Sequence, residues 1–357
     1  MSKYGTSLLV PSVHELVKQP ITKVPDQYLH PNQDPPDISN TTLPQVPVID
    51  LSKLLSEDVT ELEKLDDACK EWGFFQLINH GVNPSMVENV KRDVQEFLNL
   101  PMEKKKQFWQ IPDELEGFGQ LFVVSEDQKL EWADMFFIHT LPINARNLRL
   151  FPNFPQPLRD NIENYSSQLK KLCLTIIERM AMALKIESNE LLDYVFEDVF
   201  QTMRWTYYPP CPQPENVIGI NPHSDACALT ILLQANETEG LQIKKDGNWI
   251  PVKPLPNAFV INVGDILEVI GEKKQGGENW FQKQFSRKRS GDHDSRDMDH
   301  AAAVAAAAFA VNLQDVSEQK SETPEASLTK IKSKVDGTKP PIPLLNSASK
   351  RLSSKDA

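Results

Sequence analysis

What the chain has little of excludes several protein classes. Its 357 residues contain only four cysteines, none in a C-x-x-C spacing, so neither a zinc knot nor a disulfide framework is indicated and a reducing compartment is expected. No apolar run approaches the roughly 18 residues of a membrane span, and the N-terminus lacks the apolar core of a signal peptide. Lys and Arg number 38 against 50 Asp and Glu, and the net charge of -12 argues against a nucleic-acid surface. We therefore expect a cytoplasmic protein, with no membrane and no nucleic-acid partner, that acts on a small organic molecule.

The charge is unevenly distributed along the chain. Residues 1–272 hold 23 basic and 39 acidic side chains, whereas residues 273–357 hold 15 and 11. The C-terminal part is rich in Ser, Lys, Thr and Pro and poor in aromatics, and such a composition cannot bury enough apolar area to offset chain entropy. We expect disorder from about Glu318 onward and a lone marginal helix in the Ala-rich run 299–311. With the basic run Arg287–Arg289, the tail could instead be a docking peptide for a protein partner or a nuclear-import-like patch.

Helical periodicity and cap residues dominate the first half. Apolar residues recur at three- and four-residue steps after Ser56 and after Asn83, and along one broad stripe of 156–184. The predicted elements are, in chain order, a strand at 46–51, a helix capped by Ser56 and ended by Gly73, a strand at Phe74–Ile78, a helix opened by Asn83-Pro84 and a long bracing helix at 156–184.

From Thr202 the hydrophobic period changes to two and the segments shorten. The predicted strands are 202–208, 227–233, 240–244, 248–252, 258–263 and 265–270. Pro and Gly separate them. Short strands in this pattern predict an antiparallel sandwich or jelly roll.

An H-x-D pattern lies within this strand-rich half. His223 and Asp225 would place an imidazole and a carboxylate on the same side of an extended chain. They would be two of the three ligands of a 2-His-1-carboxylate triad, which leaves one face of an Fe(II) ion open to substrate and dioxygen. By itself one H-x-D is a weak signal, and the alternative interpretation is an ordinary pair of surface-loop residues.

Longer motifs surround this pair. They are TYYPPCPQP at 206–214, NPHSDACALTILLQ at 221–234, GLQIKKDGNWIPVKPLPNAFVINVGDILEVI at 240–270, VPVIDL and EWGFFQLINHGV within 46–82, and EGFGQLFVVSEDQKLEWADMFF at 116–137. With these motifs, residues 46–270 resemble the plant Fe(II)/2-oxoglutarate-dependent dioxygenases, in particular the senescence-related, alkaloid O-demethylase-like and anthocyanidin-synthase-like branch.

The resemblance implies a fold, a set of cofactors and three site residues. The implied fold is α+β, with a double-stranded β-helix (jelly roll) core behind an N-terminal α/β region. His223 and Asp225 would ligate Fe(II), and Tyr208 would hydrogen-bond the distal carboxylate of 2-oxoglutarate, although Tyr208 could also be a core aromatic. Dioxygen would oxidise 2-oxoglutarate to succinate and carbon dioxide, with ascorbate as reductant, while a small apolar specialised metabolite is hydroxylated, demethylated or desaturated. Thr206 stands where family members usually have Asn.

The resemblance ends after Ile270. In the family an apolar strand follows, with a second metal His roughly fifty to sixty residues past the Asp and an R-x-S that binds the cosubstrate carboxylate. Here the later histidines, His293 and His300, stand in an Asp-rich stretch without a strand pattern, and the nearest match to R-x-S is Lys288-Arg289-Ser290. We therefore expect an incomplete jelly roll, no third metal ligand and little or no dioxygenase activity.

These observations divide the chain into five parts. They are an N-terminal arm at 1–45, a dioxygenase N-terminal domain at 46–150, bracing helices at 151–198, a partial jelly roll at 199–270 and an unrelated, largely disordered tail at 271–357. Three alternatives to an ordinary enzyme stay open: a non-catalytic protein that binds a ligand or partner, an enzyme completed by a His from another chain, and the product of a fused or wrongly assembled gene.

A few further side chains have two interpretations. Some aromatic residues could line a substrate pocket by resemblance, or could be ordinary core residues. These are Phe122, Trp132, Phe136 and Phe137. His80, in a turn, is expected to be structural, and Arg204 is expected to be a solvated charge.

Overall fold

The computed structural model describes residues 7–30, 44–112, 114–185, 200–268, 308–316 and 350–353, the last two segments as backbone. Its strands are β1 (Val48–Asp50), β2 (Phe74–Ile78), β3 (Gly117–Gly119), β4 (Asp134–Leu141), β5 (Phe200–Tyr208), β6 (Leu229–Gln234), β7 (Leu241–Lys245), β8 (Asn248–Pro251), β9 (Phe259–Val263), β10 (Ala308–Val316) and β11 (Lys350–Ser353). They form a large sheet of order β1-β2-β9-β6-β10-β5-β4-β3 and a small sheet of order β11-β7-β8.

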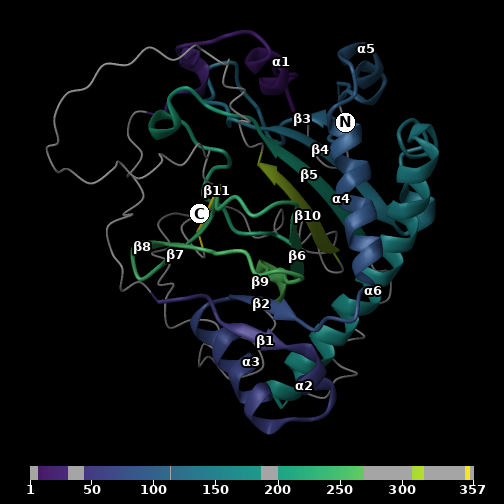
Figure 1. The fold of residues 1–357 in the computed structure, drawn as a ribbon, viewed down its shortest axis with the longest axis vertical. Coiled ribbons are helices and arrows are strands. Elements are labelled where there is room, and N and C mark those ends of the chain that lie inside the picture. Colours follow the sequence, from purple (N-terminus) through teal and green to yellow (C-terminus); the bar gives the residue numbers. More distant parts are fainter. Residues whose placement is uncertain are drawn as a thin grey trace, which may run out of the picture.

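Helices pack around the large sheet, the two longest along one of its sides. They are α1 (Val13–Val17), α2 (Leu51–Leu55), α3 (Val59–Glu71), α4 (Pro84–Leu98), α5 (Met102–Lys105) and α6 (Gln156–Ala183), with short 3-10 turns at Asp26–Tyr28, Lys106–Phe108, Ile143–Ala145, Phe151–Asn153 and Pro214–Asn216. Figure 1 shows α4 and α6 running beside the sheet, and α2 and α3 next to β1 and β2. Among the helices of the described residues, none has both the length and the hydrophobicity that crossing a membrane requires.

Local signals place most helix ends. The Asn83 side chain accepts a hydrogen bond from the N–H of Ser85 and caps α4, as predicted. Gly73 follows α3 at a φ of +63°, a left-handed conformation that glycine adopts without strain. The prediction of Ser56 as the cap of α3 is wrong: Asp58 accepts from the N–H of Glu61, while Ser56 ends α2. Ser and Asp can both cap a helix, and Ser56 is already the C-terminal cap of the short helix α2, which was not predicted.

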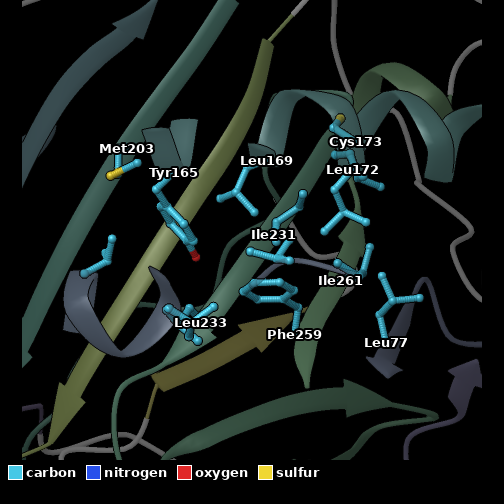
Figure 2. Packing of buried hydrophobic residues seen from close by; sticks show 14 of the residues in the cluster. Leu77, Tyr165, Leu169, Leu172, Cys173, Met203, Ile231, Leu233, Phe259 and Ile261 are labelled. Carbon is cyan, nitrogen blue, oxygen red and sulfur yellow. The ribbon is translucent and has the colours of Figure 1, made fainter. Parts of the chain in front are cut away.

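The long helix α6 packs against one face of the large sheet, as its apolar stripe predicts. Its buried residues face alternate residues of the central strands, among them Ile231 and Leu233 of β6 and Ile261 of β9 (Figure 2). The α6 residues labelled there are Tyr165, Leu169, Leu172 and Cys173. Each aliphatic side chain that is fully buried in this way stabilises the fold by about 1.5–3 kcal/mol.

The opposite face of the same strands packs on the small sheet. Leu232 of β6 and Val260 of β9 lie in a cluster with Leu241 and Ile243 of β7. Because successive side chains of a strand point to opposite faces, one strand contributes to both cores. The predicted α+β fold with an incomplete jelly roll is thus visible as two facing sheets, which the described strands do not close into a barrel.

Two C-terminal segments join these sheets, contrary to the sequence-based expectation. β10 lies between β5 and β6 and is parallel to both, and β11 is parallel to β7. The predicted helix at 299–311 is therefore wrong at 308–311, and the predicted disorder from Glu318 is wrong at 350–353; the rest of both predictions lies outside the described residues. Backbone hydrogen bonding to a strand on each side outweighs the high helix propensity of alanine at residues 308–311.

Two other differences concern strands. The predicted strand at 265–270 is wrong over 265–268, which are helical. β4 was not predicted, because its residues are buried on both faces and give no period-two signal. It pairs antiparallel with β5 and carries Asp134 at its start.

The N-terminal arm docks against this body through Asp134. Its carboxylate accepts hydrogen bonds from the Ser12 hydroxyl at 2.5 Å and from the N–H of Val13 at 2.7 Å, at the start of α1. Burial raises the pKa of Asp134, and these hydrogen bonds oppose the rise. Apolar residues of the arm form a cluster with the body, which includes Val10, Val13, Tyr28, Trp132 and Tyr208.

Candidate metal centre

The H-x-D pair lies in the loop that leads into β6. His223 Nε2 and Asp225 Oδ1 are 3.4 Å apart, and the two side chains are 27% and 16% exposed. Two ligand atoms that each lie about 2.1 Å from one ion, at right angles, are separated by about 3 Å. The structure therefore brings the two predicted metal ligands together at a separation that suits a shared ion.

A backbone carbonyl determines which nitrogen of His223 carries the proton. Nδ1 lies 2.8 Å from the carbonyl oxygen of Asn221, and a carbonyl can only accept, so Nδ1 is the donor. Nε2 is buried and has no hydrogen-bond partner among the described residues. An imidazole held through one nitrogen with the other lone pair unused is the arrangement that metal-binding histidines adopt.

Asp225 is held from two neighbouring strands. Its Oδ2 accepts hydrogen bonds from the Thr230 hydroxyl on β6 at 2.6 Å and from the Asn262 amide on β9 at 2.9 Å. Thr230 and Asn262 are directly paired across the sheet and are buried. Charge-assisted bonds to a carboxylate are strong, so Oδ2 is fixed and Oδ1 faces His223. Sequence reasoning missed both donors, although each is a polar residue within an otherwise apolar strand.

Close backbone packing holds the second half of the loop. The N–H of Asp265 donates to the Asp225 carbonyl and the N–H of Gly264 to the Ala228 carbonyl, each at 2.9 Å. A Cβ atom on Gly264 would lie 1.9 Å from the Cys227 carbonyl oxygen. Glycine is therefore required there, and the loop cannot move away from the end of β9 without breaking these bonds.

Two charged residues lie behind the loop. Glu131 Oε1 accepts hydrogen bonds from the backbone N–H and the side-chain amide of Asn221, at 2.7 and 3.1 Å. Burial raises the pKa of Glu131, and the Asn221 bonds and the Arg204 charge oppose the rise. Arg204, which was expected to be a solvated charge, is half-buried, and its Nε is buried without a hydrogen-bond partner among the described residues.

Tyr208 lies on a different element from the metal pair. It is at the end of β5, 2% exposed, and packs in the cluster that contains Trp132. Of the aromatic residues with two interpretations, Trp132 and Phe136 are fully buried core residues, whereas Phe122 is 60% exposed. The assignment of Tyr208 to the cosubstrate stays a prediction.

His80 has a structural role, as expected from its turn. Its ring packs on Phe259 with the centroids 4.3 Å apart, and its Nδ1 accepts a hydrogen bond from the N–H of Val82 at 3.2 Å. Burial lowers the pKa of His80 below its ordinary value. A neutral imidazole whose Nδ1 already accepts a hydrogen bond within its own turn is suited to packing against an aromatic ring.

A third metal ligand is not supplied by the described part of the chain. Within it, no group of three or more His, Cys, Asp or Glu side chains is arranged to hold a metal ion. His293, His300 and Lys288-Arg289-Ser290 lie outside the described residues. The donor set in place, one imidazole and one carboxylate, fits a hard or borderline divalent ion such as Fe(II).

Two family sequence models match the chain. Residues 46–157 match the N-terminal family of the non-haem dioxygenase in morphine synthesis, and residues 199–276 match the 2OG-Fe(II) oxygenase superfamily. The chain belongs to this superfamily.

Known relatives of this superfamily member cover about three quarters of the chain. Protein SRG1 of Arabidopsis thaliana is 54% identical over 74% of this chain and 76% of that protein. Thebaine 6-O-demethylase of Papaver somniferum is 48% identical over 76% of this chain and 77% of that protein. The oxoglutarate-dependent flavonoid 7-O-demethylase 1 of Ocimum basilicum is 52% identical over 74% of this chain and 72% of that protein.

A solved structure agrees with the fold. The crystal structure of JOX2 in complex with 2OG, Fe and JA has a TM-score of 0.67 and 33% identity, over 73% of this chain and 75% of that chain. The predicted family and the predicted jelly-roll class are thereby confirmed for this superfamily member. The superfamily match ends at residue 276, close to the change of composition after Ile270. The relatives support 2-oxoglutarate- and Fe(II)-dependent oxygenase chemistry on specialised metabolites as the activity of the family.

Proposed function

We propose that this chain binds Fe(II) through His223 and Asp225, binds 2-oxoglutarate with the help of Tyr208, and oxidises a small specialised metabolite by hydroxylation, demethylation or desaturation. The observation that carries the proposal is the buried Nε2 of His223, which lacks a hydrogen-bond partner among the described residues and lies 3.4 Å from Asp225 Oδ1. Demethylation is supported by the names of two relatives, which are O-demethylases of a flavonoid and of an alkaloid.

The residues of this chain would each do one task at that centre. When bound, Fe(II) supplies the reaction of dioxygen with 2-oxoglutarate that oxidises the substrate, and ascorbate keeps the metal reduced. Asn221 keeps the proton of His223 on Nδ1, so that Nε2 is available. Thr230 and Asn262 occupy Oδ2 of Asp225, so that Oδ1 is directed at the same point. The buried strands behind the loop exclude water and thereby strengthen these interactions.

The number of protein ligands limits the activity that we propose. With two ligands from the described residues, Fe(II) would be bound more weakly and in a less defined geometry than with three. We therefore infer slow turnover by the isolated chain, or completion of the site by a His from a second chain. A second candidate function follows from the same observation: a non-catalytic protein that binds a ligand or partner through the remaining sandwich.

Metal affinity and succinate formation distinguish these functions. The purified chain is titrated with Fe(II) without oxygen, and succinate is then measured after addition of 2-oxoglutarate, ascorbate and air. We expect His223→Ala to weaken Fe(II) binding about tenfold or more. His139→Ala is the matched control, because it removes an imidazole whose Nδ1 lies 3.2 Å from Glu116 Oε1, towards the end of β4 that is remote from Glu131. Equal affinity of His223→Ala and the unchanged chain would favour the non-catalytic function.

The domain limits and the location also belong to this proposal. We propose that the dioxygenase part spans residues 46–270, with an arm before it and a tail of different origin after it. The match of the superfamily model to residues 199–276 supports this division. We propose a cytoplasmic location on the sequence pattern given above, with the tail as a candidate contact for a protein partner.

A further inference from the structure

We propose that Glu131 is a positioning residue of the metal centre, which orients the His223 imidazole through Asn221. The inference rests on the proposed function, because it requires that His223 binds a metal ion. Glu131 lies 90 positions before Asn221 in the chain, just ahead of β4. Sequence spacing alone gives no reason to connect it with the H-x-D pair.

The connection consists of three hydrogen bonds, two from Asn221 to Glu131 and one from His223 to Asn221. Glu131 Oε1 accepts from both N–H donors of Asn221, backbone at 2.7 Å and side chain at 3.1 Å. The carbonyl of Asn221 then accepts from Nδ1 of His223 at 2.8 Å. Two bonds to one carboxylate oxygen fix both the backbone and the side chain of Asn221. The direction of its carbonyl, and with it the plane of the imidazole, is therefore defined by Glu131.

Glu131 is itself held by a rigid part of the fold. Its N–H donates to the Gln120 side-chain oxygen at 3.2 Å, and its carbonyl accepts from the Gln120 amide at 2.8 Å. The next residue, Trp132, is fully buried and donates to the carbonyls of Ile218 and Pro209, at 2.7 and 3.1 Å. The backbone around the carboxylate is thus fixed by Gln120, which follows β3, and by residues 209 and 218, which precede Asn221 in the chain.

The second half of the loop has other attachments, which separates positioning from general support. Asp225 is held by Thr230 and Asn262 and by the backbone bond from Asp265. Loss of the Glu131 carboxylate would therefore release Asn221 and His223 while Asp225 stays in place. Burial raises the pKa of Glu131, and the Asn221 hydrogen bonds and the positive charge of Arg204 oppose that rise.

The test compares Co(II) binding by three forms of the full chain, because Co(II) reports affinity and coordination in one absorption titration. Glu131→Leu removes the acceptor, and we expect about tenfold weaker binding with an altered Co(II) spectrum. Glu131→Gln keeps an acceptor oxygen, and we expect it to retain affinity within about threefold. Glu126→Leu is the matched control on the exposed preceding loop and should leave both readouts unchanged.

A second readout does not depend on metal. The ¹⁵N signals of the His223 ring in the metal-free chain report which nitrogen is protonated. We expect a single Nδ1–H tautomer in the unchanged chain and in Glu131→Gln, and a mixture in Glu131→Leu. A residue that only supports the fold would lower the melting temperature without changing the tautomer or the Co(II) spectrum.

The outcomes separate this inference from the proposed function. If the unchanged chain binds Co(II) no better than His223→Ala, the proposed metal site fails. If it binds Co(II) more tightly than His223→Ala but Glu131→Leu binds equally well with the same spectrum, the metal site stands and the positioning role of Glu131 is overturned. Should Glu131→Leu not fold, Glu131→Asp replaces it, because its carboxylate is shorter by one methylene. An unchanged affinity of Glu131→Asp would overturn the role in the same way.

Discussion

The central strands β5, β6 and β9 and the C-terminal segments β10 and β11 contribute to the same sheets by different means. β6 and β9 carry buried apolar side chains on both faces and pair antiparallel, and β5 contributes Met203, Trp205 and Tyr207 to the cluster that packs against α6. β10 and β11 are parallel to their neighbours and enter from the far end of the chain. The position of the central strands in the sheets is determined by the packing of their side chains. The position of β10 and β11 is determined by backbone N–H and C=O groups of the neighbouring strands that need a partner. A sheet with a vacant strand position therefore recruits a segment that can supply N–H and C=O groups.

The sequence of β10 is compatible with that place. Its register sets Phe309, Val311 and Leu313 level with Leu229, Ile231 and Leu233 of β6. These six positions are apolar, and the β6 residues lie on the face that packs against α6. Apolar positions of β10 thus coincide with apolar positions of β6, which is what the pairing of two half-buried strands requires.

The largest expected effect is in the packed region. Trp205 on β5 is fully buried and contacts the rings of Phe97, Phe136 and Phe154. Trp205→Ala should lower the free energy of unfolding by about 3–5 kcal/mol, because it removes a large apolar group and leaves a cavity. Urea denaturation measures the change. A loss below about 1 kcal/mol would mean that this core is less closely packed than described.

Proline substitutions compare a central with an edge strand. Val311→Pro in β10 removes an N–H between two neighbours and should cost about 2–3 kcal/mol, because a buried acceptor is left without its donor. Leu352→Pro is the matched substitution in β11, at the edge of the small sheet, and should cost about 1 kcal/mol or less. Thermal and urea unfolding of both variants checks the order. Equal, negligible effects would contradict the place of β10 in the large sheet.

The smallest effect is expected from the arm, where the half-buried His14 makes the stability depend on pH. Burial and the nearby Lys105 lower the pKa of His14 from 6.5 to about 4 in the folded chain. Between these two values the unfolded chain binds the additional proton, so stability is fully present above about pH 6.5 and falls towards pH 4. His14→Gln should reduce the slope of unfolding free energy against pH in that window. The groups that face His14 are Lys105, Lys18 and Glu15.

The comparison for this measurement is His80, another half-buried histidine whose pKa is lowered by burial. His80→Gln should reduce the slope as well, because burial also lowers the pKa of His80. The double variant should show the two reductions combined, since the two sites lie on different elements. An unchanged slope in His14→Gln would mean that His14 does not contribute to the pH dependence of stability.

The local pattern of apolar residues was sufficient to predict most helices and strands of the packed region. The 3.6-residue period gave α4 and α6 close to their observed bounds, and the period of two gave β5 to β9. It was insufficient for β4, which is buried on both faces, and for the segment 265–268, where apolar residues are equally compatible with a helical turn. For 308–316 the Ala-rich composition favoured a helix, and a partner strand on each side decided otherwise.

Some residues of the candidate site could likewise be predicted from local sequence, and others could not. His223 and Asp225 were found from their spacing, because two ligands on one extended segment leave a local signature. Thr230, Asn262 and Glu131 were not found, because each reaches the loop from another segment and none has a distinctive spacing. The half-burial of Arg204 was not foreseen either, because charge alone does not tell how far a residue on a strand is covered by its neighbours.

By itself, then, the sequence determined the family, the alternation of apolar residues that forms the sandwich, and the two adjacent metal-binding side chains, since all of these are local patterns. Only the tertiary structure decided which residues hold that pair, that Glu131 stands behind His223, and that residues 308–316 complete the large sheet. The physical reason is the distance along the chain over which each kind of signal acts. Periodicity and spacing act over a few residues, whereas hydrogen bonds between distant strands depend on which backbone and side-chain groups the fold leaves to be satisfied.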